Sequence, residues 1–157
     1  MPATITTLPQ RVAALPGELR AVCDELFAIG ASHGVLEMPP TMLAWAEQQF
    51  GNTDSVTHQT IIKVVNRLTL EGALFNPLRA KRPAMHSGDD AELEAWIAAE
   101  LRDDIFAHPL CTTPADRFGR IRGAHCISAS NVAKYDGWHG VVVFDEPHPL
   151  RFARARS

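Results

Sequence analysis

Cysteine is scarce in this sequence, which has only three among its 157 residues: Cys23, Cys111 and Cys126. Such an odd and sparse set excludes the disulfide framework that stabilises many small secreted domains. The first eight residues have no basic stretch followed by an apolar run, so no signal peptide is predicted. We therefore expect a reducing, cytoplasmic setting.

Long apolar runs and a strong net charge are missing as well. No stretch approaches the roughly 20 apolar residues of a membrane-spanning helix, so we expect no membrane partner. The formal net charge is −3, which does not indicate binding to bulk nucleic acid. The sequence also has no Walker loop, no Rossmann glycine fingerprint and no Gly-x-Ser-x-Gly elbow.

The apolar residues that are present make up 46% of the chain, enough for a packed core. In the first third they recur with helical spacing over residues 15–29, and Gly30 is the predicted end of that helix. A second helix is predicted over residues 41–50, with Thr41 as its N-cap and Gly51 as its end. We therefore expect residues 1–54 to form a helical N-terminal region.

Residues 55–157 are richer in strand signals. Residues 61–68 are rich in β-branched side chains and favour a strand, with a helix as the alternative. Residues 121–129 and 138–144 are predicted to be two strands joined by a turn at Asp136-Gly137. Between the strand at 61–68 and the strand at 121–129 we expect loops at 75–83 and 109–116, and an amphipathic helix at 89–102. The predicted fold is α+β, with the helical region packed on a small antiparallel sheet.

A basic segment bounded by two prolines is the first candidate site. Arg79, Lys81 and Arg82 lie between Pro77 and Pro83. Two guanidinium groups three residues apart can converge on one phosphate if the backbone is held rigid. The alternative interpretation is a solvated basic loop.

A histidine and a cysteine three residues apart form the second candidate site. His108 and Cys111 have the spacing of half a zinc site, because one turn can present both side chains to a metal. A closed site needs two further ligands, and the candidates elsewhere in the chain are His125, Cys126, His139 and His148. The alternative is a buried thiol beside a surface histidine.

Small polar residues near a predicted strand end form the third candidate site. The asparagine amide of Asn131, next to Ser130, offers donors and an acceptor that can read a base edge or a ribose. Gly137 and Gly140 permit a close approach of the backbone. The alternative is an ordinary β-hairpin turn with Trp138 packed on it.

These three sites follow one another in an order that resembles a known family. From about residue 59 to residue 150, the chain is similar to the N-terminal half of the galactose-1-phosphate uridylyltransferases of the histidine-triad superfamily. The matching segments are Asn76-Pro77-Leu78, Arg79-Ala80-Lys81-Arg82-Pro83, His108-x-x-Cys111, Asn131, and the strand that leads to Pro147-His148. The Arg-Ala-Lys-Arg-Pro match is the most specific element.

The resemblance implies roles for these residues in a nucleotidyltransferase that binds a nucleotide or nucleotide sugar. Phosphates would be held by Arg79, Lys81 and Arg82, and the nucleotide would be contacted by Asn76, Ser130 and Asn131. The resemblance also makes zinc a candidate cofactor, with His108, Cys111 and His148 as ligands. His108 replaces the family's first cysteine, and some relatives have lost the metal.

The catalytic His-x-His-x-Gln strand of that family has no counterpart here, because no His-x-His occurs in the sequence. No catalytic residue is therefore predicted. One hypothesis is that the chain acts with a nucleophile from another chain, either a homo-oligomer or a separate catalytic chain. A second is a non-catalytic nucleotide-binding or protein-interaction module. A third is a small helical and β protein with an unrelated role.

Overall fold

The computed structural model of the chain describes residues 4–81 and 104–145, which form a mixed α+β fold. The predicted helix at 89–102, and the predicted site residues Arg82 and His148, lie outside the described residues. None of the described helices is long and apolar enough to cross a membrane.

The N-terminal region begins with helices and then changes to a strand. η1 (Ile5–Thr7), α1 (Leu8–Ala13) and α2 (Gly17–Leu26) are followed at once by β1 (Phe27–Glu37). The prediction of a helix to residue 29 with Gly30 as its cap was therefore wrong. Gly30 lies inside β1 and pairs with Lys63. β1 contains two glycines, which weaken a helix. Backbone pairing along the whole strand stabilises the extended form more than the helical spacing of the apolar residues stabilises a helix.

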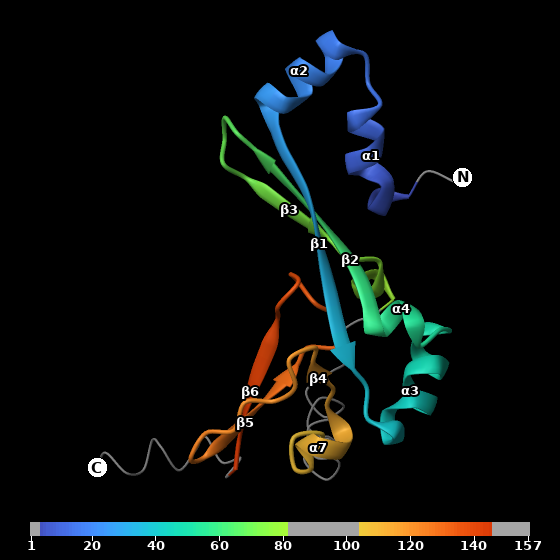
Figure 1. Cartoon of the computed structure of the whole chain (residues 1–157), viewed down its shortest axis with the longest axis vertical. Coiled ribbons are helices and arrows are strands. Elements are labelled where there is room, and N and C mark those ends of the chain that lie inside the picture. The colour runs from blue at the N-terminus through green and yellow to red at the C-terminus, as the bar shows by residue number, and fades with distance from the viewer. Residues whose placement is uncertain (1–3, 82–103, 146–157) are drawn as a thin grey trace, which may run out of the picture.

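β1 is the longest strand, and it organises the larger sheet. Nine of its residues pair antiparallel with β2 (His58–Asn66), from Phe27 opposite Asn66 to Val35 opposite His58. β2 also pairs with β3 (Gly72–Phe75), and the lower end of β1 pairs with β4 (Ala115–Asp116). The four-stranded order is β3-β2-β1-β4 (Figure 1). The predicted strand at 61–68 is confirmed with shifted ends, whereas β3 was not predicted.

Helices surround the lower half of this sheet. α3 (Pro40–Phe50) ends at Gly51, whose φ of 78° is the left-handed cap conformation expected there. The helix starts one residue earlier than predicted, and Thr41 is not its N-cap, since its hydroxyl donates to the Cys111 carbonyl. Three further helices of the described residues have four residues each: α4 (Asp54–Thr57), α5 (Pro77–Ala80) and α7 (Pro109–Thr112). The last two occupy predicted loops.

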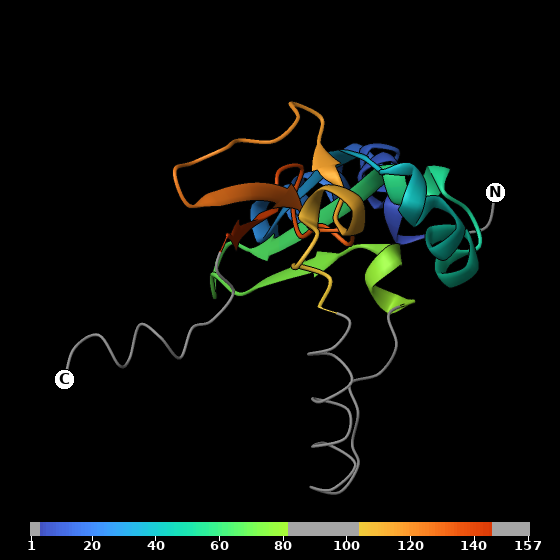
Figure 2. The same cartoon turned by 90° about the horizontal axis from the view of Figure 1, so that it is seen from below.

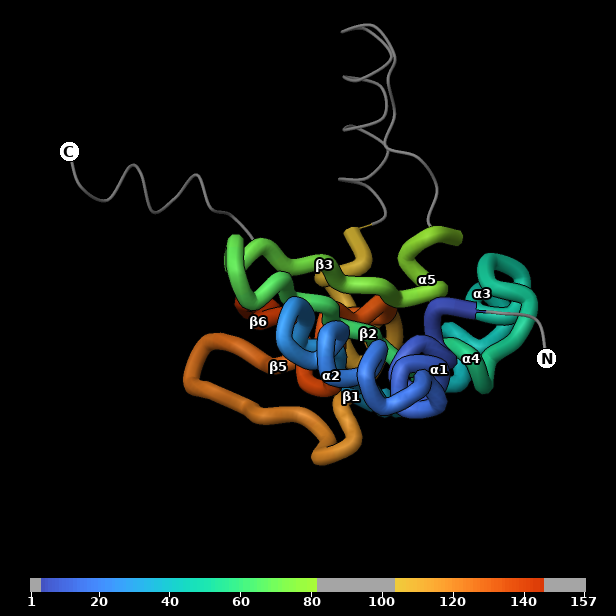
Figure 3. The backbone as a smooth tube through the Cα atoms, turned by 90° about the horizontal axis from the view of Figure 1, so that it is seen from above, coloured from blue at the N-terminus to red at the C-terminus, as the bar shows by residue number. Residues whose placement is uncertain are grey.

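The second sheet is the predicted pair of strands. β5 (Cys126–Ser130) and β6 (Gly140–Phe144) pair antiparallel, with Ser130 opposite Gly140, so both strands are confirmed but shorter than predicted. Seen from below, the connection between β4 and β5 (orange) extends away from the helices (Figure 2). Seen from above, α3 and α4 lie on the opposite side of the molecule from this connection (Figure 3).

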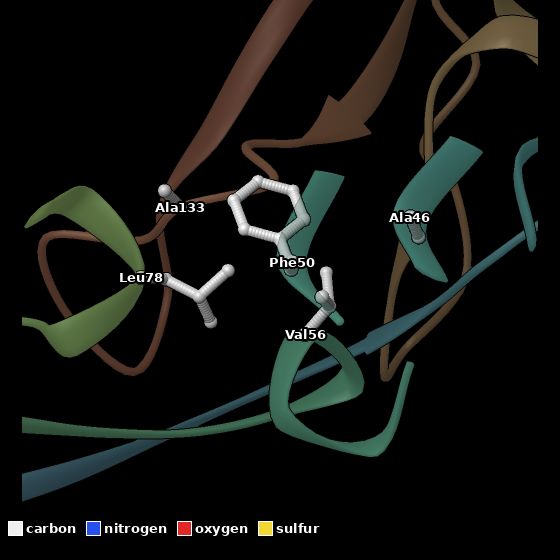
Figure 4. Packing of buried hydrophobic residues seen from close by; sticks show 5 residues of the cluster. All are labelled: Ala46, Phe50, Val56, Leu78 and Ala133. Carbon is white, nitrogen blue, oxygen red and sulfur yellow. The ribbon is translucent and has the colours of Figure 1, made fainter. Parts of the chain in front are cut away.

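The main apolar cluster joins elements that are far apart in the sequence. Phe50, Val56, Leu78 and Ala133 converge from α3, α4, α5 and the connection between β5 and β6 (Figure 4). Ala46 belongs to the same cluster, and a smaller cluster lies between β5 and β6. The main cluster therefore fixes α5 and the β5–β6 connection relative to the helices.

A buried ion pair lies beside this cluster. Lys134 is fully buried, and its Nζ lies 2.6 Å from Oδ2 of the buried Asp116. Gly34 of β1 makes room for the lysine, because a Cβ at that position would lie 2.5 Å from Lys134 Cδ. The ion pair thus ties the β5–β6 connection to β4 and to β1.

Replacing one partner of this ion pair is expected to destabilise the fold. Lys134→Met should lower the free energy of unfolding by about 3–5 kcal/mol, because Asp116 would keep an uncompensated buried charge. Denaturant unfolding followed by circular dichroism measures the change. Lys134→Met/Asp116→Asn should recover part of the loss, and Lys63→Met is the control at a half-exposed lysine. A loss below about 1 kcal/mol in Lys134→Met would contradict the role assigned to the ion pair.

Candidate functional site

The connection between β5 and β6, called here the 131–139 loop, contacts several of the predicted site residues. It starts at Asn131, directly after β5, and its backbone bonds to itself through the Asn131 N–H and the His139 carbonyl, 2.9 Å apart. The Asn131 side-chain oxygen accepts from the Ala133 N–H at 3.1 Å. These bonds give the loop a defined shape next to the cavities described below.

Asn76, predicted to contact a nucleotide, is buried and bonds to the 131–139 loop. Its amide nitrogen donates to Gln59 Oε1 and to the Lys134 carbonyl, both at 2.8 Å. Its oxygen accepts from the Leu78 N–H at 3.0 Å and so caps α5. Both amide protons are used, so a nucleotide would have to displace one of these bonds to be read by Asn76.

Gln59, a residue that no motif predicted, completes this contact. Its amide nitrogen donates to the carbonyls of Val56 and Val132, and its oxygen accepts from the Lys134 N–H at 3.0 Å. Gln59 and Asn76 together satisfy buried backbone groups that would otherwise lack partners. A glutamine at the start of a β-branched strand gives no sequence signal for such a role.

The basic segment expected to hold phosphates is divided in the structure. Arg79 donates to the Ala133 carbonyl at 3.1 Å and to the Tyr135 hydroxyl, and its guanidinium lies 3.6 Å from the centroid of the Tyr135 ring. Lys81 is exposed and donates to the Phe50 carbonyl at 2.9 Å. Arg79 therefore lies against the 131–139 loop, whereas Lys81 lies against the end of α3.

A cavity of about 530 Å³ lies between α3, α7 and the start of the 131–139 loop. None of its described lining residues is charged, so it is called the uncharged cavity here. Its walls include two half-exposed aromatic rings, Trp45 and Phe106, and two of the three predicted nucleotide-contacting residues, Ser130 and Asn131. The sequence did not predict the part played by Trp45, since it occurs in a segment recognisable only as a helix.

The polar wall of the uncharged cavity is held by buried interactions. Ser130 is 2% exposed, its N–H donates to the Pro114 carbonyl at 2.8 Å, and its hydroxyl lies 3.4 Å from Asp116 Oδ2. Arg120 donates to the carbonyls of Pro109, Thr113 and Ser128 and thereby joins α7 to β5. Burial lowers the pKa of Arg120 from its usual range.

His108 and Cys111 line a second cavity of about 500 Å³, which adjoins the uncharged cavity through Phe106 and Cys111. Arg122 and Asp145 lie in its wall as an ion pair at 3.1 Å. Within residues 4–81 and 104–145, no group of three histidine, cysteine or acidic side chains could hold a metal. The described residues thus supply two of the three ligands predicted for zinc but no complete site.

A third cavity of about 240 Å³ lies between η1, α4, β2 and α5. It is lined by two of the predicted site residues, Asn76 and Lys81, together with Gln59 and His58. The structure therefore separates the predicted site into two groups. Ser130 and Asn131 line one cavity and Lys81 lines another, with the Gln59–Val132 hydrogen bond of 2.6 Å between them.

No model of a protein family, no curated protein and no solved structure matched the chain in the comparisons.

The 131–139 loop is also held at its middle by an ion pair with β2. Lys63 donates to Asp136, and the Gly137 N–H donates to the same carboxylate at 2.7 Å. These two hydrogen bonds, the lysine's first, lower the pKa of Asp136 to about 2. The space at Gly137 is tight, because a Cβ there would lie 3.1 Å from the His33 carbonyl oxygen.

The Asp136 interaction is expected to show a defined dependence on pH. Because the pKa is lower in the folded state, Asp136 stabilises the fold above its unfolded pKa of about 3.9 and loses this effect as the pH falls towards 2. Asp136→Asn should therefore lower stability by about 1 kcal/mol or less at pH 7, since the ion pair is half-exposed, and by nothing near pH 2. Unfolding curves at pH 7, 4 and 2 measure the difference. A difference that grows on acidification would contradict the assignment.

Proposed function

We propose that the chain is a nucleotide-binding region of the uridylyltransferase-like type, which binds the nucleoside part of its ligand in the uncharged cavity. The observation that carries the proposal is the lining of this cavity, where Ser130 and Asn131 face the same space as Trp45 and Phe106. Its volume of about 530 Å³ falls within the range of small-molecule sites.

The chemistry of the lining suits a nucleoside better than a charged metabolite. A base and a ribose carry no charge, so they avoid the high cost of burying an ion in a cavity whose described walls carry no charge. An aromatic ring can stack on a base, and Trp45 and Phe106 supply two such rings in the wall of the cavity. A free phosphate would have no counter-charge there.

Cations for the phosphates are available on the far side of the 131–139 loop. Arg79 bonds to the Ala133 carbonyl, two residues after Asn131. Its guanidinium is held by Tyr135 and could exchange that contact for phosphate oxygens, which it can bind through two parallel hydrogen bonds. Arg82 follows in the same basic segment. This arrangement supports the order of contacts that the resemblance implies.

Zinc is a weaker part of the proposal. His108 and Cys111 line one cavity, and His148, the third ligand that the resemblance implies, lies outside the described residues. We assign no step of the proposed function to a metal. Elemental analysis of protein purified without chelator tests whether zinc is present.

Stacking on Trp45 is the first expectation of this proposal. Calorimetry should show that wild-type protein binds uridine and UDP, and Trp45→Ala should weaken both by about 1–3 kcal/mol, the range for one base on an aromatic ring. Trp138→Ala is the matched control, because Trp138 is also exposed but lies outside the cavity lining. The proposal fails if wild-type protein binds neither ligand, or if the two variants lose affinity equally.

The absence of catalysis by the isolated chain is the second expectation. A test for catalysis distinguishes a catalytic region from a binding module. Nucleotidyl transfer in the family needs a histidine that attacks the α-phosphorus of UDP-glucose, so that a nucleotidyl-histidine forms and the bond to glucose 1-phosphate breaks, with glucose 1-phosphate as the leaving group. The sequence contains no His-x-His. His139 is the best placed histidine, because it follows the Asp136-Gly137 turn, but no second histidine stands two residues from it in the sequence. We expect no nucleotidyl adduct by mass spectrometry after incubation with UDP-glucose. An adduct that disappears in His139→Ala would show that this chain is itself catalytic.

A further inference from the structure

The third cavity, lined by Thr6, Ser55, His58, Thr60, Asn76 and Lys81 among others, is called here the basic cavity. Its described lining contains one lysine and one histidine, and no carboxylate. Hydroxyl groups from three different elements line it as well. Its volume of about 240 Å³ is below the range usual for whole nucleotides or drug-sized ligands, and is suited to a small group.

We propose that the basic cavity binds a phosphate group, with Lys81 and His58 as its principal contacts. The inference deepens the proposed function, because Lys81 belongs to the segment expected to hold phosphates. It also assigns the anion to His58, Ser55 and Thr60, which no motif in the sequence indicated. Arg79, which is absent from the described lining, is not part of this site.

Lys81 has the donors that such a site needs. One of the three ammonium protons bonds to the Phe50 carbonyl at 2.9 Å, and two remain for an anion. The bond to Phe50 holds a side chain that would otherwise be flexible, so less conformational entropy is lost when an anion binds. Charge-assisted hydrogen bonds of this kind are about twice as strong as neutral ones.

His58 is fixed by its neighbours in a comparable way. Its Nδ1 lies 3.1 Å from Asp54 Oδ1 and 3.1 Å from the Thr57 hydroxyl. These contacts occupy one ring nitrogen, and Nε2 is the second site of the ring. When the ring is protonated, Nε2 donates to an anion while Nδ1 donates to the Asp54 carboxylate. Asp54 is the acidic group nearest the imidazole and reduces the net positive charge there.

The basic cavity is separated from the uncharged cavity by a thin polar wall. Gln59 lines the basic cavity and donates to the carbonyl of Val132, which lines the uncharged one. The phosphate could therefore belong to the same nucleotide, reaching around this wall, or to a second ligand such as a sugar phosphate. Both sources present the same chemistry to Lys81 and His58.

Orthophosphate is the probe that tests the site directly. Titration of the whole chain, followed by amide chemical shifts, should perturb residues 55–60 and 76–81, with saturation in the millimolar range or below. Lys81→Met should weaken the affinity about tenfold or more, the effect of losing a charged hydrogen bond. Lys63→Met is the matched control, because it removes a lysine that lies outside the cavity lining, and it should bind orthophosphate as wild type does.

Three results decide the inference. No orthophosphate binding by wild-type protein, or equal losses in Lys81→Met and Lys63→Met, would overturn it. Competition between orthophosphate and UDP, but not between orthophosphate and uridine, would support the site with the nucleotide as the source of the phosphate. Simultaneous binding of orthophosphate and UDP would support it with a second ligand as the source. Uridine binding reports on the uncharged cavity alone, so failure of the proposed function is distinguished from failure of this inference.

Discussion

The buried ion pair between Lys134 and Asp116 is the interaction on which the rest of the structure depends. Removing two charges from water costs several kcal/mol per ion, and this cost is offset only by close and well-bonded geometry. Here Nζ and Oδ2 are 2.6 Å apart, and the second carboxylate oxygen accepts from the Arg117 N–H at 2.8 Å. Gly34 leaves the space that the lysine stem fills. Because a displacement that separates the two groups would leave a buried charge unpaired, the ion pair favours this arrangement of β1, β4 and the 131–139 loop.

The fixed position of the 131–139 loop explains why the uncharged cavity and the basic cavity share one wall. The same loop places Asn131 and Val132 in the uncharged cavity. Its Lys134 N–H donates to Gln59 Oε1 and its Lys134 carbonyl accepts from the Asn76 amide, and both of these side chains line the basic cavity. A candidate ligand site is therefore built on a buried scaffold, although its residues belong to a loop. Side chains held in this way meet the requirement that contacts to a ligand be positioned before it binds.

The sequence predicted the local elements that depend on neighbouring residues. α3 with its left-handed Gly51, β2, and the antiparallel pair β5 and β6 follow from spacing and turn chemistry alone. It did not predict β1, because the apolar spacing around Val22 and Phe27 is helical while the strand is stabilised by partners in β2, from Asn66 opposite Phe27 to His58 opposite Val35. The candidate site shows the same limit. Asn131 and Lys81 could be selected by residue type, but the hydrogen bonds that use up Asn76 and the contact of Arg79 with Tyr135 arise only in the folded chain.

The basic cavity is lined by Lys81 and His58, whereas the described lining of the uncharged cavity has no charged residue. This difference restricts the ligands that would suit each cavity. A phosphate in the uncharged cavity would lose its hydration without gaining a cation, whereas a base in the basic cavity would cover Lys81 without using its charge. A molecule with one neutral ring system and one anionic end satisfies both cavities, and so does a pair of molecules that divide these properties. The Gln59–Val132 hydrogen bond distinguishes the two cases, because a single nucleotide must pass around it while two ligands need not. The buried ion pair holds the 131–139 loop, and with it the wall formed by Gln59 and Val132. This wall therefore determines whether the uncharged cavity and the basic cavity would act as one site or as two.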